Sequence, residues 1–162
     1  MNGNTIKLKV RREIAPCSKC GTQKEFYYLS DYSYGEKFIL VNDGKDYAYV
    51  NLLENKVFDE LEKIIDATLK KHNKVLSRSK FVQCLNSLFG ITCDDINNKP
   101  IDTSKTRKIC KVCGADKFGD NVQEDLIDLE FDVVTHISWE GLSDSRKRDL
   151  VEMELGRQGY LN

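Results

Sequence analysis

"REIAPCSKCGTQ" (Arg12–Gln23) and "RKICKVCGAD" (Arg107–Asp116) carry the same arrangement in distant parts of a chain of 162 residues. Each stretch has two cysteines that are separated by two residues and followed at once by a glycine. This spacing lets both thiolates point at one ion, and the glycine can take the positive φ that closes the turn. The pattern predicts two metal-binding turns, which we call knuckles, at 17–21 and 110–114.

One knuckle supplies two ligands, whereas a closed tetrahedral site needs four, so we expect one site shared by both knuckles. Zinc is the expected metal because tetrahedral all-thiolate sites favour it, and iron is the second choice. Two alternatives stay open from the residues alone. The cysteine pairs can be unrelated, or one can be a catalytic dithiol, although neither leads into a recognisable helix. The expected ligands are Cys17, Cys20, Cys110 and Cys113.

The two segments resemble the knuckles of zinc-ribbon and rubredoxin-type proteins, in which two such turns grip one ion. The resemblance implies a single zinc ion held by four cysteines. The 89 residues from Gly21 to Ile109 make the spacer far longer than that of a simple ribbon. We therefore expect a single domain, 1–162, in which a strand-and-helix insert, 22–109, separates the knuckles and the metal clips them together. With four thiolate ligands no position is open to substrate, so we expect a structural site.

The composition is that of a folded soluble protein, with 31% charged and 40% hydrophobic residues. The 25 Lys+Arg nearly balance the 26 Asp+Glu, for a net charge of -1, which argues against a strongly basic nucleic-acid binder. No apolar run has the length of a signal peptide or a membrane span, so we expect a cytoplasmic protein without membrane contact. In that reducing compartment, paired cysteines more often hold metal or do redox chemistry than form structural disulfides.

Hydrophobic periodicity predicts an α+β fold, an antiparallel sheet with about three helices. The expected strands are 5–13, 24–33, the hairpin 38–41 and 47–52 around a turn at 42–44, and Leu129–Trp139. The expected helices are 57–69, a second from Ser77 or Ser79 to Phe89 that Gly90 ends, and a third after Ser143. Asn51 or Asn55 is the expected cap of the first helix.

The remaining cysteines and the histidines are not expected to bind the metal. Cys84 falls on the apolar face of a predicted helix and is expected to be a small buried hydrophobe. Cys93 lies in a predicted loop as a free thiol. His72 fits the C-cap of the first helix, and His136 is expected to pack within the last strand.

Two features are candidates for contact with a partner. Six of the seven tyrosines lie between Tyr27 and Tyr49, and those outside the core suit a protein interface or stacking on bases. Segment 116–132 carries seven acids and one lysine, which suits a basic partner. Ordinary sheet packing and a solvated face are the respective alternatives. The candidate contact residues are Tyr32, Tyr34, Asp120, Glu124, Asp125 and Asp128.

The sequence contains no HExxH, GxSxG or Gly-rich phosphate loop, and we predict that the protein is not an enzyme. We predict a small structural-zinc protein that binds another macromolecule, first of all a protein. Toxin-neutralising immunity proteins are one class with such a composition. The competing class is a zinc-containing nucleic-acid-binding protein, which the cations of 7–12 together with Lys19 and Lys24 favour.

Overall fold

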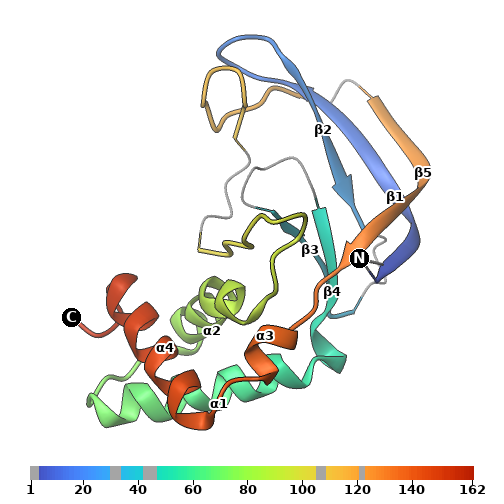
Figure 1. Cartoon of the computed structure of the whole chain (residues 1–162). Helices are drawn as coiled ribbons and strands as arrows, with labels where there is room; N and C mark the ends of the chain where they lie inside the picture. Colours follow the sequence, from blue (N-terminus) through green and yellow to red (C-terminus); the bar gives the residue numbers. More distant parts are fainter. Residues whose placement is uncertain (1–3, 30–33, 42–46, 105–108, 121–122) are drawn as a thin grey trace. The chain divides into compact units, whose positions relative to one another are not determined.

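The computed structural model describes residues 4–29, 34–41, 47–104, 109–120 and 123–162 (Figure 1). These residues form a five-stranded sheet and four α-helices, so the predicted α+β class is confirmed. They divide into two compact units, Met1–Leu53 with Thr106–Val133, and Glu54–Lys105 with Val134–Asn162. The first, the sheet unit, contains all five described strands, and the second, the helical unit, contains the four α-helices.

The insert predicted at 22–109 is therefore shared between the units. Its strands belong to the sheet unit, and its two helices belong to the helical unit together with the C-terminal residues. The sequence predicts a single domain, and this stays a prediction. Denaturation would test it by showing whether the two units unfold together.

The sheet unit is built on two long strands, β1 (Thr5–Pro16) and β5 (Gln123–Val133), which pair antiparallel. β2 (Gln23–Tyr28) pairs antiparallel with β1, and β3 (Glu36–Leu40) pairs antiparallel with β4 (Tyr47–Asn51). The strand order is β2-β1-β5-β4-β3, and the β4–β5 pair is parallel. The predicted antiparallel sheet is confirmed except for this pair. Between β4 and β5 the chain passes through the helical unit. A parallel pair requires such a long connection.

Apolar alternation explains how β1 and β5 pair, because successive side chains of a strand point to opposite faces. Three apolar pairs share one face: Ile6 with Phe131, Leu8 with Leu129, and Val10 with Ile127. Val10, Tyr49 and Phe131 form the buried centre of this core, and Tyr27 and Tyr47 pack against it. The hairpin predicted around 42–44 is confirmed in its strands, while its turn lies outside the described residues.

The strand predicted at Leu129–Trp139 is wrong at both ends. β5 begins six residues earlier and stops at Val133, and a short helix, α3, occupies Ile137–Glu140. The cause is a distant cap: the carboxylate of Asp94 accepts hydrogen bonds from the backbone N–H of Ile137, at 2.7 Å, and of Ser138, at 2.9 Å. These bonds satisfy two N–H groups that a helix start leaves without an intrahelical partner. Local sequence does not reveal a cap that lies more than 40 positions away.

The three longer helices begin where their caps predict. Asn55 caps α1 (Lys56–Lys71), Ser77 caps α2 (Arg78–Leu88) and Ser143 caps α4 (Asp144–Arg157), each by accepting from a backbone N–H of the first turn. α2 ends at Leu88, one residue before the predicted end, but Gly90 does not end the helical path, because α2 passes directly into the 3₁₀ turn Phe89–Thr92. Glycine at position 90 instead allows the backbone of Ile101 to lie close by, since a Cβ there would lie 2.5 Å from the carbonyl oxygen of Ile101.

Apolar side chains of α1, α2, α3 and α4 make the core of the helical unit. Its largest fully buried members are Trp139, Leu61, Ile65, Leu88, Leu155 and Val151. Glu60 at the edge of this core accepts hydrogen bonds from Trp139 Nε1, at 2.8 Å, and from the buried Lys147 Nζ, at 2.9 Å. Cys84 is fully buried, as predicted, and burial raises the pKa of its thiol to about 12.

Candidate metal centre

Both knuckles belong to the sheet unit, although 89 residues separate them in the chain. The first, 17–21, forms the connection between β1 and β2, and the second, 110–114, precedes β5. In Figure 1 the orange segment that leads to β5 lies beside the blue connection between β1 and β2. The sheet thus brings the two cysteine pairs together.

The two knuckles have the same backbone geometry. The N–H of Cys17 donates to Thr22 O at 2.8 Å, and the N–H of Cys110 donates to Ala115 O at 2.7 Å. In both, the glycine N–H donates back to the first cysteine's carbonyl, and the glycine φ is +73° at Gly21 and +72° at Gly114. A Cβ on either glycine would meet nothing within 4 Å, so the glycine is required for its φ and not for space.

The four predicted sulfur ligands converge, and all of them lie within 4.8 Å of one another. Two of the sulfur pairs join different knuckles at short distance: Cys17 Sγ lies 3.6 Å from Cys113 Sγ, and Cys20 Sγ lies 3.6 Å from Cys110 Sγ. A zinc–sulfur bond of about 2.3 Å places the sulfurs of a tetrahedron about 3.8 Å apart, whereas a disulfide bond measures about 2.05 Å. The four free thiols therefore have the spacing of metal ligands and not of disulfides.

The knuckles are also joined by contacts that do not involve sulfur. Cys17 forms an antiparallel bridge with Phe118, and the N–H of Ser18 donates to Lys117 O at 3.0 Å. The ring of Phe118 packs edge-on against Phe26 of β2, with 5.1 Å between the centroids. These supports are not visible in the sequence, because the two phenylalanines lie far apart in the chain and have no spacing in common.

Hydrogen-bond donors around the sulfurs favour thiolate at part of the site. The backbone N–H of Cys20 lowers the pKa of Cys17, and Thr22, through its hydroxyl and its N–H, lowers the pKa of Cys20 to about 6. The N–H of Ala115 acts in the same direction on Cys113, but burial and the neighbouring thiols outweigh it and raise that pKa to about 12. Cys17 and Cys20 thus favour the thiolate form, which is the form that binds a metal cation.

The cluster is closed on one side and open on the other. Cys17 and Cys110 are buried, Cys113 is half-buried and Cys20 is exposed. This group of four cysteines is able to hold one metal ion with sulfur ligands alone. Both segments of the predicted clip belong to the sheet unit, where a shared metal would join the β1–β2 connection to the segment before β5.

Four of the six predicted partner-contact residues have side chains that the structure describes: Tyr34, Asp120, Asp125 and Asp128. Tyr34 is 78% exposed and Asp120 is exposed, while Tyr32 and the side chain of Glu124 lie outside the described part of the chain. Asp125 accepts from Arg12 Nη2 at 2.6 Å, and Asp128 is the register partner of Lys9. Asp125 and Asp128 are three residues apart on one strand and so point to opposite faces of the sheet. Each of these two acids has a basic neighbour on β1.

Of the two histidine predictions, one is confirmed and one is wrong. His72 is the C-cap of α1, as predicted. His136 precedes α3 and is not in a strand; its Nδ1 lies 2.7 Å from the carbonyl oxygen of Thr92 and its Nε2 lies 2.9 Å from Asn55 Nδ2. These neighbours hold the His136 ring in place between Thr92 and Asn55.

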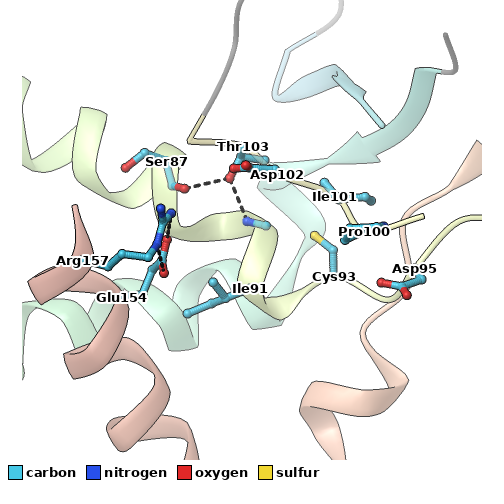
Figure 2. Close-up of a pocket in the computed structure, with 11 residues that line it drawn as sticks. Ser87, Ile91, Cys93, Asp95, Pro100, Ile101, Asp102, Thr103, Glu154 and Arg157 are labelled. Carbon is cyan, nitrogen blue, oxygen red and sulfur yellow. Dashed lines mark hydrogen bonds and ion pairs between the residues drawn. The ribbon is translucent and has the colours of Figure 1, made fainter. Parts of the chain in front are cut away.

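Cys93 lines a pocket of about 280 Å³ in the helical unit (Figure 2). The hydroxyl of Thr103 in this pocket accepts from the N–H of Gly90 at 2.8 Å and donates to Ser87 O at 3.0 Å, and Arg157 Nε donates to Glu154 at 2.8 Å. These polar groups of the pocket thus bond one another. Among the lining residues, all of which are described, there is no histidine to activate the thiol, and burial raises the pKa of Cys93 to about 12.

The fold and the site define an α+β protein with a four-cysteine cluster that is able to bind a metal ion. No protein-family model, curated protein sequence or solved structure gives a significant match to this chain. Within the described residues, no helix has both the length and the apolar character that crossing a membrane requires.

Proposed function

We propose that the four cysteines bind one structural zinc ion and that the metal fixes a surface with which the protein binds another protein. The observation that carries the metal assignment is the 3.6 Å approach of sulfurs from different knuckles. Zinc is proposed because closed tetrahedral sites with four thiolates are typical of it. Four protein ligands leave no position for a substrate, which supports a structural role and not a catalytic one.

The knuckles themselves support a binding surface. Val112, between the two ligands of the second knuckle, is 70% exposed, and Ile109 just before it is 45% exposed. Such aliphatic side chains beside a rigid metal site suit contact with a protein, because burying them removes apolar surface from water. A toxin-neutralising, immunity-type role is one form of this proposal, and a basic toxin would require the acidic side chains of β5 to exchange their partners on β1.

Nucleic-acid binding is the second candidate, because three exposed lysines surround the knuckles. These are Lys19, Lys111 and Lys117. Exposed lysine side chains are able to contact phosphates, and such binding weakens steeply as the salt concentration rises.

Co-expression with the proteins encoded by adjacent genes tests the proposed function. A stoichiometric complex that forms with the zinc-loaded chain and disappears after chelation is the expected result. Binding of an oligonucleotide with a steep salt dependence, with no protein complex, would favour the second candidate. A purified chain that contains no metal would contradict both.

A further inference from the structure

We propose that the metal centre is also a site of oxidation, at which a peroxide attacks Cys20 and converts the zinc-bound clip into a disulfide-bonded one. The inference rests on the proposed function, since it concerns the regulation of the same zinc site. Among the four ligands, all of which the structure describes, only Cys20 is exposed: Cys17 and Cys110 are buried and Cys113 is half-buried. An oxidant in solution therefore meets the sulfur of Cys20 first.

The role of Cys20 as a ligand makes its sulfur a nucleophile. A cysteine binds zinc as a thiolate, and the thiolate is also the form that attacks a peroxide. Thr22 Oγ1 lies 3.2 Å from Cys20 Sγ, so its hydroxyl is able to donate a hydrogen bond to that thiolate. Cysteines that sense oxidants have the same properties, because they are accessible thiolates with a second cysteine close by.

The second cysteine is Cys110, which belongs to the other knuckle. Its Sγ lies 3.6 Å from Cys20 Sγ. A disulfide bond measures about 2.05 Å, so these two sulfurs have to approach by roughly 1.5 Å. Cys17 Sγ and Cys113 Sγ make a further pair between the knuckles, also at 3.6 Å. The geometry thus favours disulfides that cross from one knuckle to the other.

Contacts that do not involve sulfur hold the two knuckles together when zinc leaves. Just before the first knuckle, Pro16 O accepts from the N–H of Gly119 at 2.8 Å. On β2, Lys24 Nζ donates to Ile109 O at 3.0 Å, directly before the second knuckle. Because these bonds do not depend on the metal, sulfurs of different knuckles stay within reach of each other during oxidation.

The reaction with hydrogen peroxide balances as follows. The Cys20 thiolate attacks one oxygen, the O–O bond breaks, and a sulfenic acid and a hydroxide ion result. The Cys110 thiolate then attacks the sulfenic sulfur, so that an S–S bond forms, the S–O bond breaks and a second hydroxide leaves. Protons from the buffer convert both hydroxides to water. The two sulfurs together give two electrons to the peroxide, and Zn²⁺, which has lost two of its four ligands, dissociates.

The disulfide would link the same two segments that the metal links. Cys20 and Cys110 are 90 positions apart, so the crosslink closes the same long loop as the shared ion and keeps its constraint on the unfolded chain. Disulfides within each CxxC segment would leave the knuckles unlinked. The proposal therefore predicts an oxidised chain that has no zinc, remains clipped and returns to the zinc form after reduction.

The test treats the full zinc-loaded chain, of measured zinc content, with a small molar excess of hydrogen peroxide. A chromogenic chelator follows zinc release, and mass spectrometry of unreduced tryptic peptides identifies the disulfides. Trypsin cleaves after Lys19 and Lys111, which lie between the two cysteines of each knuckle, so every possible pairing gives different peptides. A brief treatment with N-ethylmaleimide ranks the thiols by reactivity while all ligands stay in place. Cys93→Ser is the matched control, because it removes a thiol outside the metal centre.

We expect zinc release, a first disulfide between Cys20 and Cys110, and renewed zinc binding after treatment with dithiothreitol. N-ethylmaleimide should modify Cys20 at least about tenfold faster than Cys17 or Cys110. Cys93→Ser should change the rate of zinc release by less than about twofold.

Three results would overturn the proposal and leave the zinc site itself standing. They are zinc that stays bound in peroxide, disulfides formed within the knuckles, and a sulfinic acid on Cys20 without any disulfide. Faster alkylation of another ligand than of Cys20 would contradict the assigned point of attack. A purified chain that contains no zinc would contradict the proposed function and this inference with it.

Discussion

Replacement of one buried ligand, Cys110→Ser, should remove most of the stability that the metal provides. Cys20 and Cys110 approach each other across 90 positions of the chain, so a shared ion closes a very long loop in the unfolded state. The chain-entropy relation for a crosslink of that length gives about 4.6 kcal/mol. Serine is a weaker ligand, and its hydroxyl would be buried, because Cys110 is only 3% exposed. Since three cysteines remain and some affinity survives, we expect a loss of about 3–5 kcal/mol in the free energy of unfolding.

Urea denaturation measures this loss with and without a chelator. The single tryptophan, Trp139, reports on the helical unit, while six of the seven tyrosines lie in the sequence range of the sheet unit and dominate its near-UV signal. Coincident transitions would support the predicted single domain, and separate transitions would show that the two units unfold independently.

Cys84→Ser is the matched control, because it buries the same hydroxyl at a fully buried cysteine outside the metal centre. Its expected cost is about 1–2 kcal/mol, and a chelator should not change that cost. The reasoning is refuted if Cys110→Ser costs no more than Cys84→Ser, or if chelation leaves the unfolding of the parent chain unchanged.

Two further changes test the local geometry. Gly114→Ala should lower the free energy of unfolding by about 1–2 kcal/mol, because the residue has a φ of +72°. Gly114→Asn should lower it less, since asparagine tolerates that region better. Equal losses in urea denaturation would contradict the role assigned to this glycine. At Asp94, partial burial raises the pKa, but the bonds from Ser138, Thr135 and Ile137 outweigh it and lower the pKa to about 2. Because the folded pKa lies below the ordinary value of 3.8, the carboxylate stabilises the fold above about pH 4, and this contribution is lost as pH falls toward 2. Asp94→Asn should therefore be less stable than the parent at pH 7 and differ little from it at pH 2, and a difference independent of pH would count against the cap.

The sequence predicted the convergence of the four cysteines because their pattern is local and repeated. Each CxxCG segment by itself predicts a turn, and the capping residues Asn55, Ser77 and Ser143 likewise predict where the helices begin. What it did not predict depends on distant partners. The end of β5 and the start of α3 follow from Asp94, and the parallel β4–β5 pair follows from the path of the chain through the helical unit.

The same limit applies to the candidate contact surfaces. The run of acids at 116–132 is clear in the sequence, but its pairing with β1 is a matter of strand register. Only the structure shows that Asp125 bonds Arg12 and that Asp128 faces Lys9. A pocket beside β2 likewise joins Tyr27, Tyr47 and Lys111, which have no spacing in common and meet only in the folded sheet.

X-ray absorption at the zinc edge, combined with metal analysis of the purified chain, tests the convergence of the two cysteine pairs most directly. We predict one zinc ion per chain, surrounded by four sulfur atoms at about 2.3 Å and by no nitrogen or oxygen ligand. A chain that is fully folded without metal, or a metal shell that contains fewer than four sulfurs, would contradict the account.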